Sequence, residues 1–93
     1  MKKTVEVEYV GIEDIQDIMD DVYALMREGH YVSIEMSNYY KDRERMRISI
    51  MLGGWDAIKG YDYEFEFYMS DREEDVSSMN KCKSILNNLL AEG

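Results

Sequence analysis

The sequence contains no proline, and it has only one cysteine and one histidine. The lone cysteine, Cys82, cannot form an internal disulfide bond, so nothing indicates an oxidising compartment. No proline-rich or repetitive segment divides the 93 residues, which suits a single domain spanning residues 1–93. A chain of this length can bury roughly two thirds of the surface that its unfolded form exposes, so one hydrophobic core is feasible without disulfide bonds.

Long apolar runs are also missing. No segment approaches the ~20 apolar residues that cross a membrane. The first residues are basic, but Glu6 and Glu8 interrupt the stretch that a signal peptide would keep apolar. We therefore expect neither a signal peptide nor a membrane span, and we expect the protein to act in the cytoplasm.

Positive charge is scarce in this chain. Lys and Arg together number 11 against 20 Asp and Glu, which gives a formal net charge of −9. Binding to nucleic acid or to an anionic membrane depends on Lys and Arg, so this balance argues against both kinds of direct contact. The same balance favours solubility and partners that have basic surfaces.

Four segments alternate between apolar and polar residues, which is the pattern of strands that bury one face. They are residues 4–10, 31–39, 46–52 and 61–69. Two further segments place apolar residues at helical spacing. The first covers residues 12–28 and ends near Gly29, and the second follows Ser70, where Ser70 and Glu73 form a capping-box signature.

The resulting order is β-α-β-β-β-α, and the fold class that it predicts is α+β. Both helices are amphipathic and each strand has one apolar face. The simplest packing is therefore a two-layer sandwich, with two helices on one face of a four-stranded sheet. The first crossover would be a right-handed β-α-β unit with parallel strands. The other pairs, including a hairpin across residues 41–45, would be antiparallel, so the sheet would be mixed but mostly antiparallel.

This packing leaves the other sheet face open and acidic. Its expected outward side chains are Glu6, Glu8, Ser33, Glu35, Arg47, Ser49, Met51, Asp62, Glu64, Glu66 and Tyr68. Like charges opposite each other destabilise a sheet, so the acids of the last strand need Arg47 or a partner to offset them. The first helix carries a second acidic set: Glu13, Asp14, Asp17, Asp20 and Asp21. Two interpretations stay open, a solvated surface that keeps the protein soluble or a surface for a basic partner.

Residues that could carry chemistry have no partners at a suitable spacing. His30 follows the first helix, where a cation suits the helix dipole, and Cys82 lies on the apolar stripe of the last helix. The carboxylates form no calcium-loop pattern, and Gly53-Gly54 is too short for a phosphate-binding loop. The segment around these glycines is either a flexible connection or a loop that presents Trp55 as a binding anchor. We expect no catalytic residue, no metal site and no cofactor.

The sequence thus favours a non-enzymatic protein-binding module, an acidic inhibitor that occupies a basic, nucleic-acid-binding surface of a partner such as a host nuclease. In size, charge and lack of catalytic residues, the chain resembles the small acidic inhibitors of phages and mobile elements, including anti-CRISPR proteins and nucleic-acid mimics. A phage-encoded protein of this kind would act in the host cytoplasm. The alternative is a small structural or regulatory domain that forms a homodimer through a sheet edge or a helix. The expected partner-binding residues are Glu6, Glu8, Glu35, Asp62, Glu64 and Glu66, followed by Asp17, Asp20 and Asp21, with Trp55.

Overall fold

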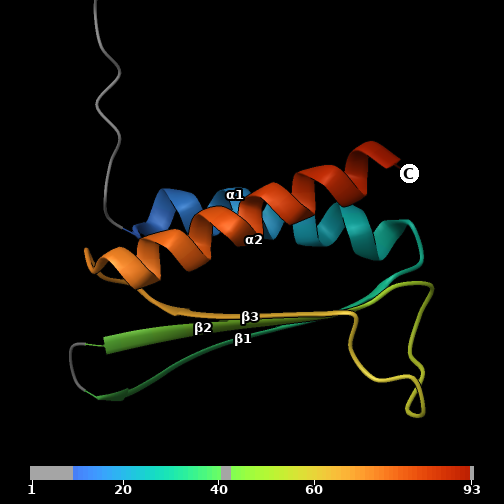
Figure 1. Ribbon diagram of the computed structural model, residues 1–93, viewed down its shortest axis with the longest axis horizontal. Helices are drawn as coiled ribbons and strands as arrows, with labels where there is room; N and C mark the ends of the chain where they lie inside the picture. The colour runs from blue at the N-terminus through green and yellow to red at the C-terminus, as the bar shows by residue number, and fades with distance from the viewer. Residues whose placement is uncertain (1–9, 41–42, 93) are drawn as a thin grey trace, which may run out of the picture.

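Two helices cover one face of a three-stranded sheet (Figure 1). The computed structural model describes residues 10–40 and 43–92. The elements are α1 (Ile12–Arg27), β1 (Tyr31–Tyr40), β2 (Arg43–Met51), β3 (Tyr63–Tyr68) and α2 (Glu73–Glu92). The predicted α+β class, with both helices on the same side of the sheet, is confirmed.

The sheet differs from the prediction in its number of strands. Within the described residues it has three strands in the order β1-β2-β3, and both neighbouring pairs are antiparallel. The predicted four-stranded mixed sheet, with its parallel crossover, is therefore wrong. The predicted first strand lies outside the described residues except for Val10, which belongs to no strand and donates its N–H to the Ser70 carbonyl at 2.9 Å. Alternation records which side chains share a face, but it does not specify which strand they pair with.

The core lies between the helices and the inner face of the sheet. β2 is the central strand, and its Met46, Ile48 and Ile50 are almost completely buried. The helices add Ile15, Ile18, Val22 and Leu25 from α1 and Met79, Cys82, Leu86 and Leu89 from α2. Helical spacing and strand alternation predict these positions correctly. Two members of the apolar pattern of α1, Met19 and Met26, are instead exposed.

Met51 is buried, although its strand pattern predicts an outward side chain. It points to the open side of β2, yet it is buried because the loop between β2 and β3 folds over it, with the Asp56 N–H 3.1 Å from Met51 Sδ. Trp55 in the same loop packs edge-on against Tyr31, with ring centroids 5.0 Å apart. The loop therefore covers one end of the open sheet face, which a strand pattern alone does not show.

The start of α2 is held by an aspartate instead of the predicted capping box. The Ser70 hydroxyl donates to Asp75 Oδ2 at 2.7 Å and accepts from the Arg72 N–H at 3.1 Å. The Tyr68 N–H donates to Asp75 Oδ1 at 3.1 Å, so one buried carboxylate connects the end of β3 to the first turn of α2. Ser70 lies too far before Glu73 to cap a helix that begins there, which is why the capping-box prediction is wrong.

Replacing Asp75 should destabilise the fold. Asp75→Ala removes the acceptor of two hydrogen bonds in a buried position, and we expect a loss of about 2 kcal/mol in the free energy of unfolding. Urea denaturation followed by circular dichroism measures this loss. Asp75→Asn keeps an acceptor for the Tyr68 N–H and should lose less. The neighbouring exposed Glu74→Ala serves as the control, and an equal loss in both alanine variants would contradict the linking role of Asp75.

Candidate functional site

Antiparallel register places opposite charges side by side on the open face of the sheet. Glu35 of β1 lies opposite Arg47 of β2, and Arg47 lies opposite Glu66 of β3. One position along the same face, Ser33 lies opposite Ser49, which in turn faces Glu64. The central strand thus carries arginine between glutamates of the outer strands, an arrangement that stabilises cross-strand pairs. The described part of this face is therefore mixed in charge, and the register places Arg47 where it can offset the acids of the last strand.

Two of the predicted acids on this side of the molecule have basic partners. Glu66 Oε2 accepts a hydrogen bond from Arg45 Nη1 at 2.7 Å. Asp62 lies just before β3, where its Oδ2 accepts from the Leu52 N–H at 2.7 Å and pairs with Lys59 Nζ at 2.9 Å. The bond from Leu52, and then the ammonium of Lys59, lower the pKa of Asp62. Its carboxylate thus closes the loop between β2 and β3 and does not continue a row with Glu64 and Glu66.

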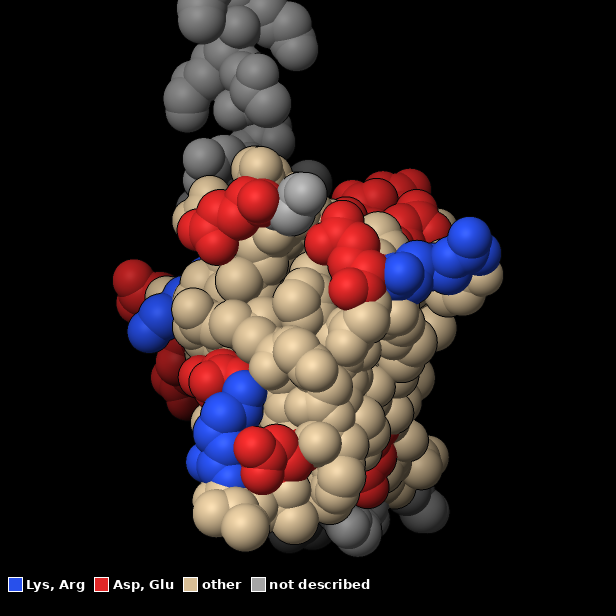
Figure 2. All heavy atoms as spheres, turned by 90° about the vertical axis from the view of Figure 1, so that its right-hand side faces the viewer, with Lys and Arg blue, Asp and Glu red and all other residues tan. Residues whose placement is uncertain are grey.

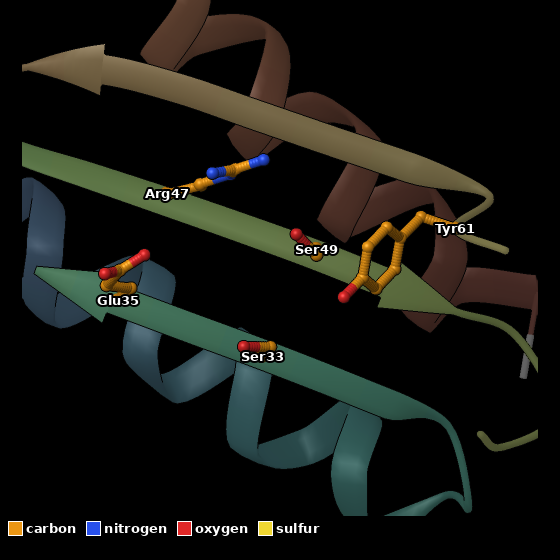
Figure 3. A pocket seen from close by; sticks show the side chains of 5 residues that line it. All are labelled: Ser33, Glu35, Arg47, Ser49 and Tyr61. Carbon is orange, nitrogen blue, oxygen red and sulfur yellow. The ribbon is translucent and has the colours of Figure 1, made fainter. Parts of the chain in front are cut away.

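A shallow polar hollow lies in the middle of the open face (Figure 3). It has a volume of about 210 Å³ and is lined by Ser33, Glu35, Arg47, Ser49 and Tyr61. Arg47 extends towards β3, while the ring of Tyr61 reaches over the opposite end of the hollow (Figure 3). Within the described residues no ion pair joins Arg47 to Glu35, although the two lie opposite each other in the register. The hollow can therefore offer hydroxyl, carboxylate and guanidinium groups to a polar group of a partner.

The carboxylates of the first helix form what we call the α1 acidic face: Glu13, Asp14, Asp17, Asp20 and Asp21. Asp14 and Asp21 lie on the side of α1 that meets α2 and are partly buried, whereas Asp17 and Asp20 are exposed. Lys83 of α2 reaches across, with its Nζ 2.8 Å from Asp14 and 3.7 Å from Asp17. In the described part of the chain, Lys83 is the only basic residue that forms ion pairs with this face.

The two partly buried aspartates of this face have pKa values that move in opposite directions. For Asp14, burial acts to raise the pKa, but bonds from Lys83 Nζ and the Gly11 N–H, together with the charge of Lys83, outweigh it and lower the pKa. For Asp21, burial and the charges of Asp17 and Asp20 raise the pKa, and Lys83 offsets them only in part. The α1 acidic face therefore retains repulsion between like charges that the protein itself does not neutralise.

The loop between β2 and β3 has a defined shape and presents apolar side chains. Asp56 Oδ1 accepts from the N–H groups of Ile58 and Lys59, each at 3.1 Å, and Lys59 Nζ donates to the Leu52 carbonyl at 2.8 Å. Trp55 is 62% exposed and Ile58 is 98% exposed. Figure 2 shows the end of the molecule that carries this loop, with an uncharged centre and charged side chains around its margins. Of the two interpretations of this segment, the geometry favours a loop that presents Trp55, and it does not favour a flexible connection.

His30 and Cys82 occupy structural positions. His30 Nδ1 accepts a hydrogen bond from the Gly53 N–H at 2.9 Å, which ties the end of α1 to the loop after β2. Cys82 is buried between the helices and the sheet, and burial with the nearby charge of Asp21 raises the pKa of its thiol to about 12. A thiol with so high a pKa forms little thiolate near neutral pH, so Cys82 lacks the reactivity of a nucleophile.

The predicted partner-binding residues do not form one surface. Glu6 and Glu8 lie outside the described residues. The open sheet face carries Glu35, Glu64 and Glu66, and α1 carries Asp17, Asp20 and Asp21. The loop between β2 and β3 is closed by Asp62 and presents Trp55 at its end of the molecule. Sequence reasoning missed two residues of these surfaces. Tyr61 lines the polar hollow, although the alternation of its segment places it on the buried side. Lys83 pairs with the α1 acidic face, and its position beside α1 depends on how the two helices pack.

Comparison with known proteins gives no relative: no protein family, no curated protein and no solved structure matches this chain. Among residues 10–40 and 43–92, no helix has both the length and the apolar composition needed to cross a membrane. Over the same residues, no group of three or more His, Cys, Asp or Glu side chains is arranged to hold a metal ion. The proposal for function therefore depends on the surfaces described above.

Replacing Lys83 should reveal the pairing between the two helices through its pH dependence. The pKa of Asp14 is lowered from 3.8, so this stabilisation is present above that pH and is lost as the pH falls through the pKa of the folded state. The pKa of Lys83 is raised from 10.5, so the stabilisation persists below that pH and is lost as the pH rises through the folded pKa. We expect Lys83→Met to lose about 1 kcal/mol near pH 7 and little below the pKa of Asp14.

Thermal or urea unfolding at several pH values measures this difference. The control is Lys81→Met, which removes an exposed ammonium from the same helix. A loss that is the same at pH 2 and pH 7 would show that Lys83 acts through packing and not through its charge.

Proposed function

We propose that this chain is a non-enzymatic protein-binding module that uses the α1 acidic face to occupy a basic, nucleic-acid-binding surface of another protein. The observation that carries this proposal is the grouping of Asp17, Asp20 and Asp21 within little more than one turn of α1, where Lys83 is the only cation of the described residues that pairs with the face. Burial first, and then the charges of Asp17 and Asp20, raise the pKa of Asp21, which agrees with this grouping. A partner that brings lysine or arginine to this face relieves the repulsion, so part of the binding free energy comes from charges that are unfavourable in the free protein.

The open sheet face supports this role less well than the α1 acidic face. Glu66 is paired with Arg45, and Glu35 and Glu66 lie on either side of Arg47. A basic partner would have to compete with these arginines for the glutamates and would meet a positive charge at the centre of the sheet. These pairings support ranking Asp17 and Asp20 before the glutamates of the sheet as binding residues.

A surface of this kind acts by steering and by competition. Rows of carboxylates attract a basic groove over long range, which speeds association and makes it sensitive to salt. A protein that occupies such a groove prevents nucleic acid from entering it, as phage and mobile-element inhibitors of host nucleases do. The cytoplasm, or the host cytoplasm for a phage-encoded protein, is where such a target would be met, and no cofactor or catalytic step is required.

The test compares two pairs of charge reversals that change the net charge equally. Asp17→Lys with Asp20→Lys alters the α1 acidic face, and Glu64→Lys with Glu66→Lys alters the open sheet face. Each variant and the wild-type protein are immobilised, and basic nucleic-acid-binding proteins are captured from a bacterial lysate and then eluted with duplex DNA. We expect the helix variant to lose the DNA-eluted proteins, because its new lysines would repel the basic residues of the partner. We expect the sheet variant to retain most of these proteins.

Three results would contradict the proposal. Equal losses from both variants would mean that net charge alone determines capture. Loss from the sheet variant only would move the site to the open face. Capture that persists unchanged from low to high salt would exclude an electrostatic mechanism, because contacts between exposed charges weaken as the Debye length shortens.

A further inference from the structure

The outer side of α1 carries a second row of apolar side chains, separate from the row that enters the core. We call it the α1 apolar stripe, and its members are Ile12 (61% exposed), Met19 (47%), Tyr23 (60%) and Met26 (42%). With Gln16, these positions follow the alternating spacing of three and four residues that builds a seam between two helices. Because Asp14 and Asp21 face α2, the helical period places this stripe on the opposite side of α1, away from the rest of the helical layer.

The area of the stripe is sufficient for the centre of an interface. Met36 of β1 points to the same side of the sheet as α1 and is half exposed, so it extends the apolar surface below the helix. Large side chains that are about half exposed together offer on the order of 500 Å² of apolar surface. A standard interface buries roughly 800 Å² per partner including its polar rim, so the stripe can form the centre of one.

We infer that the α1 apolar stripe binds the same stripe of a second copy, with the two α1 helices antiparallel about a two-fold axis near Met19. In this arrangement Met19 meets Met19 of the second copy, and Ile12 meets Met26 of the second copy at each end. Self-association is favoured because the residues that border the stripe are complementary to themselves when the helix is reversed. This inference does not depend on the proposed basic partner.

One border of the stripe is formed by the residues that directly follow Ile12, Met19 and Met26, which are Glu13, Asp20 and Arg27. Reversing one helix about Met19 brings Glu13 of one copy beside Arg27 of the other, and this pair occurs twice in the dimer. The same reversal brings the two Asp20 carboxylates towards each other at the axis, which weakens the dimer and limits its affinity. In antiparallel helix pairs such flanking charges set the orientation of the partners.

The sheet is compatible with the same axis. β1 follows α1 in the chain and runs in the opposite direction. A two-fold axis perpendicular to the sheet would therefore make the two α1 helices antiparallel to each other, and it would also make the two β1 strands antiparallel to each other. In the described part of the chain β1 pairs with β2 only, and its other side forms an edge of the sheet. An exposed strand edge offers unpaired backbone groups that can pair with another chain, so this edge can add to the helix contact.

A charge exchange tests the orientation as well as the association. Sedimentation equilibrium measures the dissociation constant of the wild type and of Glu13→Arg, Arg27→Glu and the double variant. Each single reversal replaces two attractive pairs with two repulsive ones and should weaken the dimer about tenfold. The double variant restores opposite charges at both contacts and should recover most of the affinity. Asp20→Asn, which removes the repulsion at the axis, should strengthen the dimer.

A matched pair of apolar substitutions locates the interface. Met19→Lys places a charge in the middle of the stripe and should abolish the dimer, whereas Ile58→Lys alters an apolar side chain that is more exposed but lies in the loop between β2 and β3. Circular dichroism confirms that each variant is folded. A wild-type monomer at all concentrations would overturn the inference. Loss of the dimer in Ile58→Lys but not in Met19→Lys, or a double charge variant as weak as the single ones, would also overturn it.

Discussion

Burial of the inner face of β2 beneath both helices is the constraint on which the rest of the structure depends. Met46, Ile48 and Ile50 join residues of α1 and α2 in one core, so the helices must both lie on that side of the sheet. Most of the described carboxylates of a chain with a net charge of −9 then lie on the open face of the sheet, on the outer faces of the helices or in the loops. The extent to which nearby cations neutralise the carboxylates of each surface decides which surface is suited to a basic partner.

The sheet and the helix treat these carboxylates differently. Antiparallel pairing brings residues from separate parts of the chain together, and it sets Arg47 between Glu35 and Glu66. Helical periodicity instead gathers residues that are close in sequence, so Asp17, Asp20 and Asp21 stay together. Lys83 lies 3.7 Å from Asp17 and offsets the charge at Asp21 only in part. Repulsion on α1 is held in check by the core packing of the helix, and it is available to be relieved on binding. The same helix also presents the α1 apolar stripe, so both of the proposed interactions involve α1.

The features that depend on local pattern could be predicted from the sequence. Both helices, the hairpin of β1 and β2, the buried side of β2 and the structural position of Cys82 follow from periodicity. Features that depend on distant contacts could not be predicted. The predicted number of strands was wrong because alternation does not specify pairing. Met51 is buried by a loop that no strand pattern describes. Asp75, and not Ser70, stabilises the start of α2, and it does so through a contact with β3. The polar hollow needs Tyr61 to cross to the open face, which alternation of its segment places on the other side.

The α1 acidic face holds repulsion that the protein does not neutralise at Asp21, whereas the charge of Asp14 on the same face is stabilised by Lys83. Titration of the aspartate side-chain carboxyl groups by NMR, at low salt and with the protein monomeric, tests this claim directly. We expect a pKa above 3.8 for Asp21, raised by burial and then by the charges of Asp17 and Asp20, and a pKa below 3.8 for Asp14 in the same titration. A pKa for Asp21 at or below its usual value would show that the face is already compensated, and it would remove the physical basis for a basic partner.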